Sequence, residues 1–146
     1  MRIFREGEAM KTWRWLAMAA VVLLAFSPAA AAVIGQDDKA VQAVAEPILD
    51  AVLTGFNDGN YGLYTKYFDD TLKDAIPEKK FQQVKAEIVK KLGKYQSRTY
   101  LGYLTQRNGT VALWRGRFSA SDEDVLIKLV LSKRGDNIQV VGLWFQ

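Results

Sequence analysis

The side chains of this sequence that could do chemistry are carboxylates and tyrosines, because its 146 residues include no cysteine and no histidine. This excludes a thiolate nucleophile, a histidine general base and metal sites built on Cys or His. A carboxylate beside a tyrosine in an apolar cavity can still act as a general base, with the hydroxyl stabilising an oxyanion. The candidates lie within 21 residues of one another: Asp50, Asp69, Asp70, Tyr61, Tyr64 and Tyr67.

These candidates do not make a catalytic motif. The predicted strands offer no inward-facing carboxylate, and the sequence contains no phosphate-binding glycine loop, no Gly-x-Ser-x-Gly elbow and no calcium loop. We therefore assign no catalytic, metal or cofactor residue and favour a non-catalytic domain. A small enzyme using Asp/Tyr acid-base chemistry is the alternative.

The N-terminal segment has the order basic, apolar, small that is typical of a secretory signal peptide. Lys11 and Arg14 precede an uncharged run, which ends in the sequence SPAAAA at residues 27–32. We predict cleavage after Ala32 and export to a bacterial periplasm or to the outside. Because Met10 directly precedes the pattern, residues 1–9 could be an over-extended start.

The alternative for this segment is an uncleaved anchor. Residues 16–34 form an uncharged run of 19 residues, which could nearly span a bilayer. Contact with a membrane is expected only through this segment.

Most of the apparent basicity belongs to the export segment. Residues 1–32 hold four of the 20 basic and two of the 16 acidic residues, so residues 33–146 carry a net charge of +2. A nearly neutral domain of this kind gives little support to nucleic-acid binding.

Three helical segments are predicted at the start of the domain. Apolar residues from Val41 to Phe56 recur on one helical face, with Pro47 opposite that face. A short second helix around Tyr64 follows the turn at 56–61. A third helix opens at Pro77 and ends before Gly93.

Four strands are predicted after these helices, at residues 95–107, 110–120, 125–133 and 137–145. Hairpin loops at 108–109, 121–124 and 135–136 align apolar residues in three rows on one face of an antiparallel meander. The rows are Tyr103, Trp114, Leu131 and Val140; then Leu101, Gly116, Leu129 and Gly142; then Thr99, Phe118, Ile127 and Trp144. The helices are expected to cover this face.

The opposite face of the predicted sheet mixes charged and apolar residues. Four of them are candidates for an anion-binding or partner face: Arg98, Tyr100, Arg115 and Arg117. The same face is expected to carry Leu104, Leu113, Val130, Val141, Leu143 and Phe145. It is too apolar for plain solvent surface, so a homodimer contact there is a further possibility.

The order of elements, an α+β layer arrangement, resembles the cone-shaped cystatin or nuclear-transport-factor-2-like fold, shared with ketosteroid isomerase and the SnoaL-type cyclases. More narrowly, several segments look like the small exported bacterial domain-of-unknown-function family 3887. They are the helix end FNDGNY at 56–61, the start IPEKK at 76–80, the junction LGKY at 92–95 and the closing VGLWF at 141–145.

This resemblance implies a cone between helices and sheet whose mouth can hold an apolar ligand. We expect its lining to include Tyr64, Tyr67, Tyr103, Trp114, Phe118 and Trp144. The alternative is that these aromatics simply fill the core. The resemblance also makes a dimer plausible through the outer sheet face. The sequence thus predicts an exported domain that binds a small apolar ligand or a protein partner.

Overall fold

The computed structural model describes residues 33–146, which form helices packed on an open antiparallel sheet. The helices are α2 (Asp38–Asp58), α3 (Tyr61–Tyr64), α4 (Asp70–Ala75) and α5 (Glu78–Leu92), and the strands are β1 (Tyr95–Gln106), β2 (Gly109–Phe118), β3 (Val125–Arg134) and β4 (Asn137–Phe145). The strand order β1-β2-β3-β4 is that of a meander, so the predicted α+β class is confirmed. The predicted export segment and its cleavage site lie outside the described residues.

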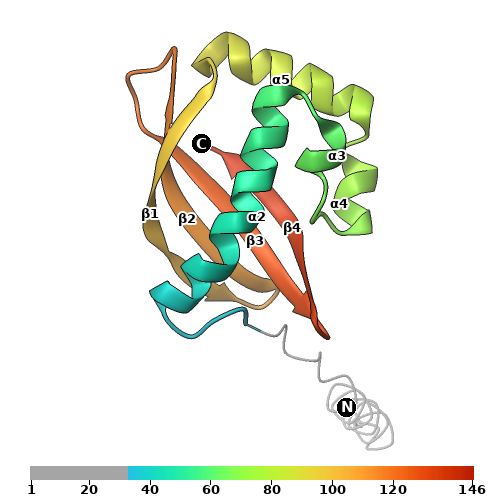
Figure 1. Cartoon of the computed structure of the whole chain (residues 1–146), viewed down its shortest axis with the longest axis vertical. Coiled ribbons are helices and arrows are strands. Elements are labelled where there is room, and N and C mark those ends of the chain that lie inside the picture. The colour runs from blue at the N-terminus through green and yellow to red at the C-terminus, as the bar shows by residue number, and fades with distance from the viewer. Residues whose placement is uncertain (1–32) are drawn as a thin grey trace, which may run out of the picture. The chain divides into compact units, whose positions relative to one another are not determined.

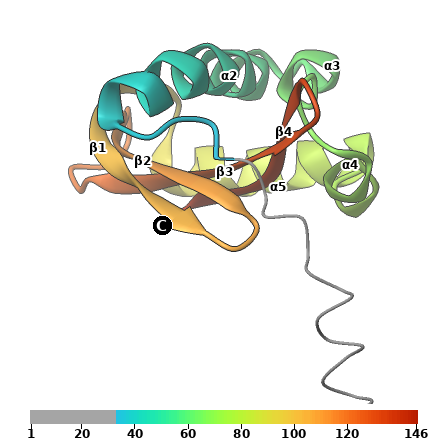
Figure 2. The same ribbon diagram turned by 90° about the horizontal axis from the view of Figure 1, so that it is seen from below.

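Helix α2 covers one face of the sheet (Figures 1 and 2). Its buried side runs from Val41 to Phe56, and Pro47 lies on the exposed side, as predicted. The Asp37 side chain accepts a hydrogen bond from the Ala40 amide at the N-terminus, and Gly59 ends the helix with φ 67°. We call the face of the sheet under α2 the covered face and the opposite one the outer face.

The predicted second helix is two short helices, α3 and α4. Between them, Phe68 forms a parallel bridge with Val140 of β4. The Asp69 amide donates to the Val140 carbonyl at 3.0 Å, and the Val140 amide donates to the Tyr67 carbonyl at 2.7 Å. The chain leaves helical geometry there because it pairs with the edge of the sheet instead.

Helix α5 has the predicted limits and crosses one end of the sheet (Figure 1). Its apolar side carries Phe81, Val84, Ile88 and Leu92. Phe81 is its only buried residue. A helix normally gains stability by burying its apolar stripe, so the exposed remainder of this stripe is a feature to explain.

The predicted register of the first hairpin is wrong, because Gln106 pairs with Gly109 and the loop is 107–108. A Cβ on Gly109 would lie 2.1 Å from the Leu131 carbonyl oxygen, so this glycine serves close strand packing. The irregularity in β1 between Tyr100 and Gly102 then moves Leu101 and Thr99 off the covered face. Leu101 is 57 % exposed.

The second hairpin is offset by four residues from the prediction, because Trp114 rather than Phe118 pairs with Ile127. The end of β2 continues instead toward β1 and α5, where the Ser119 amide donates to the Lys94 carbonyl at 2.9 Å. An even offset keeps the same residues on the same face. Four predicted inward residues of β2 and β3 are accordingly buried there: Trp114, Phe118, Ile127 and Leu129.

The third hairpin has the predicted pairing of Leu131 with Val140, but an extra residue, Val141, follows it. Beyond this bulge each side chain of β4 changes face. Trp144 therefore pairs with Lys128 on the outer face, while Phe145 packs against the core. Both placements reverse the prediction.

The hydrophobic core lies between α2 and the covered face, with contributions from α3 and α5. Its largest fully buried side chains include Trp114, Phe56 and Phe68. Among residues 33–146, no helix combines the length and the apolar character that crossing a bilayer requires.

Candidate ligand-binding site

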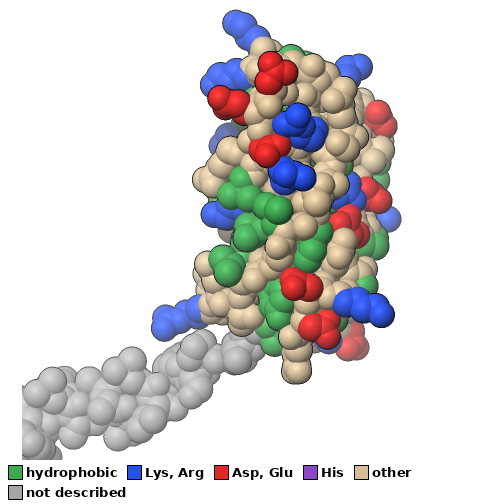
Figure 3. Space-filling model, turned by 90° about the vertical axis from the view of Figure 1, so that its left-hand side faces the viewer, with side chains coloured by type: hydrophobic (Ala, Val, Ile, Leu, Met, Phe, Trp, Pro, Cys, Tyr) green, Lys and Arg blue, Asp and Glu red, His purple; other side chains and the backbone are tan. Residues whose placement is uncertain are grey.

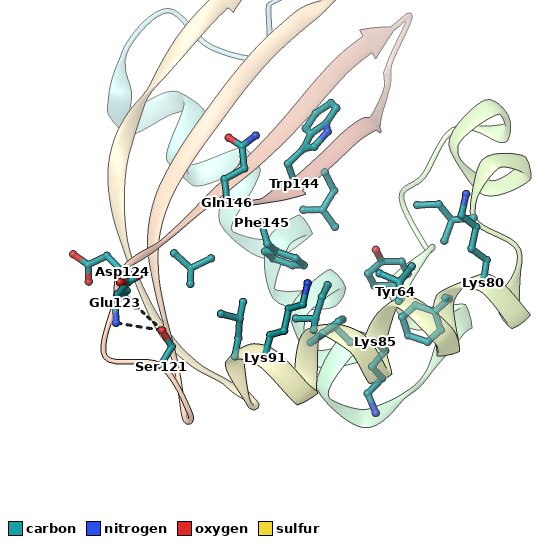
Figure 4. Close-up of a pocket in the computed structure, with 18 residues that line it drawn as sticks. Tyr64, Lys80, Lys85, Lys91, Ser121, Glu123, Asp124, Trp144, Phe145 and Gln146 are labelled. Carbon is teal, nitrogen blue, oxygen red and sulfur yellow. Dashed lines mark hydrogen bonds between the residues drawn. The ribbon is translucent and has the colours of Figure 1, made fainter.

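A groove of about 570 Å³ lies between α5 and the adjoining ends of β3 and β4 (Figure 4). This volume is in the range of pockets for small organic ligands, roughly 300–1,000 Å³. Its wall is mostly apolar: Phe56, Ile76, Phe81, Val84, Ile88, Leu92, Val125, Leu143 and Phe145. Its polar members are Tyr64, Lys80, Lys85, Lys91, Ser121, Glu123, Asp124 and Gln146, and Trp144 completes the lining.

The incompletely buried stripe of α5 forms one side of this groove. Val84 is 40 % exposed, and Ile88 and Leu92 are only partly buried, although all three lie on the side of α5 that faces the groove. On the other side, Phe145 packs against Phe56 and Phe118 with ring centroids 5.8 and 6.0 Å apart. One wall is thus firmly packed in the core, whereas the helix wall leaves its apolar surface open.

Tyr64 supplies a neutral hydrogen-bond donor in the groove. Its ring packs against Phe68 and Phe81, with centroids 5.0 and 4.5 Å away. A tyrosine is protonated at neutral pH, and burial raises the pKa of Tyr64 further, to about 12. No hydrogen bond joins this hydroxyl to another of the described residues, which leaves it available to a ligand.

Of the six residues predicted to line a pocket, the structure brings two into the groove, Tyr64 and Trp144. Trp144 stands at the edge of β4, and its indole lies over Gly142, where an added Cβ would come within 2.4 Å of the ring. The ammonium of Lys128 sits 5.5 Å from the ring centroid. Trp144 is therefore a rim residue that belongs mainly to the outer face.

The other four predicted lining residues do not contribute to the groove. Trp114 is fully buried, and its indole N–H donates to Glu46 at 2.8 Å. Phe118 packs between Tyr95 and Phe145, and Tyr103 packs against the core. Tyr67 lies beside the small hollow at the start of β4. These four aromatic side chains therefore pack in or against the hydrophobic core, as in the alternative interpretation, and do not line the groove.

The prediction that Arg98, Tyr100, Arg115 and Arg117 share the outer face is wrong for the first two. Arg98 pairs with Gly116 and points toward α2, where its Nε donates to Glu46 at 2.8 Å and its Nη2 to Asp50 at 2.7 Å. Tyr100 stacks edge-on against Trp114 and donates to Asp38 of α2 at 3.2 Å. The irregular register of β1 accounts for both changes.

Arg98 is held as a partly buried cation. Burial alone would lower its pKa, but the hydrogen bonds to the two carboxylates and to the Tyr95 hydroxyl outweigh it and raise the pKa above its ordinary value. Together Arg98, Glu46 and Trp114 tie α2 to the covered face. We call these three residues the polar clamp.

The remaining two arginines, Arg115 and Arg117, do lie on the outer face. Both approach Asp124 of the β2–β3 loop, at 3.9 and 2.8 Å respectively. The Arg117 guanidinium also donates to the Asp122 carbonyl at 3.2 Å. The two arginines thus hold the β2–β3 loop against β2 and compensate the charge of Asp124.

None of the carboxylates considered for catalysis lies in the groove. Asp50 pairs with Arg98 and is largely exposed, Asp70 is exposed, and the buried Asp69 caps α4 by accepting from the Leu72 amide at 2.8 Å. Tyr61 donates to the Ile76 carbonyl at 2.9 Å. Within residues 33–146, no three acidic side chains are grouped closely enough to hold a metal ion.

Sequence reasoning missed the contribution of α5 to the site. The signal was present, because Phe81, Val84, Ile88 and Leu92 recur at helical spacing. What the spacing does not report is how much of that stripe is covered, since this depends on the distance between α5 and the sheet.

Fold and groove together define an α+β domain with an apolar cleft beside its sheet. The family described as "Protein of unknown function (DUF3887)" matches residues 50–141, well over half of the chain, and the chain belongs to that family. This confirms the narrower of the two resemblances. No curated protein and no solved structure matches the chain.

Proposed function

We propose that this protein is an exported, non-catalytic binding domain that holds a small apolar molecule in the groove between α5 and the sheet. The observation that carries the proposal is the apolar stripe of α5, which buries Phe81 alone and faces a groove of about 570 Å³. Burying such a stripe stabilises a domain by roughly 25 cal/mol per Å². A ligand that fills the groove would bury the apolar side chains of α5 that are exposed in the free domain, and this burial would stabilise the complex.

Export and the wider family are parts of this proposal. Export is supported by the signal-peptide pattern of residues 1–32. Membership of the nuclear-transport-factor-2-like superfamily is supported by the order of elements and by a groove between helices and sheet, the place where that fold forms its cone.

The rival enzyme hypothesis has less support from the groove. Asp/Tyr acid-base chemistry needs a carboxylate beside Tyr64 in apolar surroundings. The carboxylates at the groove are Glu123 and Asp124 of the exposed β2–β3 loop, and Asp124 is already paired with Arg117. The lining therefore favours binding over catalysis.

The test blocks the groove without touching the core. In Val84→Trp, an indole replaces a side chain that is 40 % exposed at the groove wall. We expect this variant to weaken binding of the neutral apolar dye N-phenyl-1-naphthylamine at least about tenfold, or by ~1.4 kcal/mol, as measured by its fluorescence. Native mass spectrometry of the protein from its own host is expected to show a co-purified small molecule that Val84→Trp lacks.

The matched control is Gln83→Trp, which places the same indole on an exposed position of α5 outside the groove. Dye affinity should be unchanged there, and circular dichroism should show both variants folded. Equal dye affinity in the wild type and Val84→Trp would contradict the proposal.

The outer face is the second place where an interaction is predicted. One residue from each strand, β1 to β4, forms a row of cross-strand neighbours on this face: Leu104, Val111, Val130 and Gly142. The indole of Trp144 lies over Gly142. We call these residues together with Trp144 the outer row; its exposed apolar surface lies mainly at its two ends, because Val111 is only 3 % exposed. Seen from the β1 side, hydrophobic side chains gather near the middle of the surface (Figure 3). The outer row is the surface through which we expect two copies to associate.

A further inference from the structure

The charges at the mouth of the groove are unequal in a way that bears on its ligand. Three lysines of α5, namely Lys80, Lys85 and Lys91, belong to the lining, against Glu123 and Asp124 of the β2–β3 loop. Asp124 is compensated by Arg115 and Arg117, so its charge is not available to balance the lysines. The mouth is therefore cationic.

The three lysines differ in what they already contact. Lys80 donates to the Ala75 carbonyl at 3.2 Å, and the Lys85 ammonium lies near Gly59 at the end of α2. Lys91 makes no hydrogen bond or ion pair with another residue in the described part of the chain. Figure 4 shows Lys91 extending from α5 across the groove toward the end of β4, whereas Lys85 extends away from it.

Lys91 places a positive charge at the mouth of an apolar groove, and this combination suits a molecule with an anionic group and a hydrocarbon part. A carboxylate or similar anion would be attracted to Lys91, and this attraction is stronger at a protein surface than in bulk water. The apolar wall formed by Val84, Ile88 and Leu143 suits the hydrocarbon part of the same molecule.

We propose that the ligand is a free anionic amphiphile of the fatty-acid type, with its tail between α5 and β4 and its acidic head at Lys91. This inference rests on the proposed function, since it names the chemical class that the groove holds. The protonated Tyr64 hydroxyl provides a neutral donor in the same groove.

The test compares three probes with ten-carbon chains on the protein produced from the full-length chain. Decanoate, decan-1-ol and decyltrimethylammonium each displace N-phenyl-1-naphthylamine if they bind in the groove. We expect decanoate to bind most tightly and the cation most weakly. Lys91→Glu should weaken decanoate binding by about tenfold while leaving decanol binding unchanged.

The matched control is Lys90→Glu, which makes the same charge change on a neighbouring exposed residue outside the groove. It should leave decanoate affinity within about twofold, because exposed charges beyond contact distance are screened. Raising the salt concentration should reduce the advantage of decanoate over decanol.

The outcomes separate this inference from the proposed function. Equal affinity for decanoate and decanol, or equal losses in Lys91→Glu and Lys90→Glu, would overturn the anionic head while keeping an apolar pocket. Failure of both decanoate and decanol to displace the dye would overturn both. Sedimentation with phosphatidylglycerol vesicles, without binding of free decanoate, would replace the free amphiphile with a lipid surface.

Discussion

Individual side chains of the polar clamp hold α2 in place. Glu46 accepts from Arg98 and from the Trp114 indole, and these two donors come from β1 and β2. The Arg98 side chain is 13 % exposed and that of Glu46 is 29 % exposed. Removing one partner from a partly buried pair leaves the other charge without an opposite charge beside it, which costs more than the pair itself contributes.

We expect Arg98→Met to lower the free energy of unfolding by about 2 kcal/mol, because Glu46 loses its cation while remaining partly buried. The matched control is Arg115→Met, where an exposed arginine 3.9 Å from Asp124 is lost. That change should cost less than about 0.5 kcal/mol. Urea unfolding of both variants measures the difference, and equal losses would mean that the polar clamp contributes no more than a surface ion pair.

Packing between α2 and α3 depends on a glycine. A Cβ at Gly55 would lie 2.4 Å from the Tyr64 amide nitrogen and 2.9 Å from the Asn60 carbonyl oxygen. Both neighbours are backbone atoms, so α3 would have to move as a unit. Tyr64 would move with it, and the groove would change shape.

The corresponding prediction is that Gly55→Ala lowers the free energy of unfolding by about 2 kcal/mol, as overpacking does. Gly62→Ala in α3 is the control, because its new Cβ would meet only Asn60 Oδ1 at 3.5 Å. That substitution should stabilise the protein by about 0.5 kcal/mol through helix propensity. Thermal unfolding of the two variants tests this prediction. Similar changes in melting temperature for both would show that close packing of α3 on Gly55 does not contribute to stability.

The elements themselves could be predicted from the sequence more fully than their register. Apolar periodicity and the limits set by Pro77 and Gly93 are local signals, and the structure has α5 where they place it. The irregularities in β1 and the extra Val141 in β4 carry no such signal, since they depend on which backbone groups find partners across strands. They moved Arg98 inward and Trp144 outward.

The candidate site shows the same division. Tyr64 was predicted because an aromatic residue on a short helix is visible in the sequence, and the structure places it in the groove. Val84 and Lys91 lie within the helix that the sequence predicts between Pro77 and Gly93, and their spacing indicates only that this helix is amphipathic. Their place in the site follows from the spacing between α5 and β4, which is a tertiary quantity.

For the whole molecule, the outer row provides a surface larger than one side chain. Leu104 and Trp144 stand at its two ends and are 51 % and 47 % exposed, with Val111 and Val130 between them. Val111 is itself only 3 % exposed, so the apolar surface open to a partner is that of Leu104, Val130 and Trp144. Exposed apolar side chains grouped on one face of a sheet are typical of an interface between protein chains.

We therefore expect sedimentation velocity to show a dimer of the wild-type protein at micromolar concentration and a folded monomer for Leu104→Glu. A buried carboxylate without a partner would oppose association. Thr105→Glu, an exposed neighbour on the same strand, should remain dimeric. If the wild-type protein were a monomer across the whole concentration range, dimer formation through the outer row would be contradicted.

The contrasting positions of Trp114 and Trp144 give the domain two natural fluorophores with opposite surroundings. Trp13 and Trp15 lie in the segment expected to be removed on export, so these two account for the indole emission of residues 33–146. Iodide ions can collide with the half-exposed Trp144 but not with the fully enclosed Trp114. The quenchable fraction of the emission therefore reports on the groove rim and the outer row without any added label, while the unquenchable fraction reports on the integrity of the core.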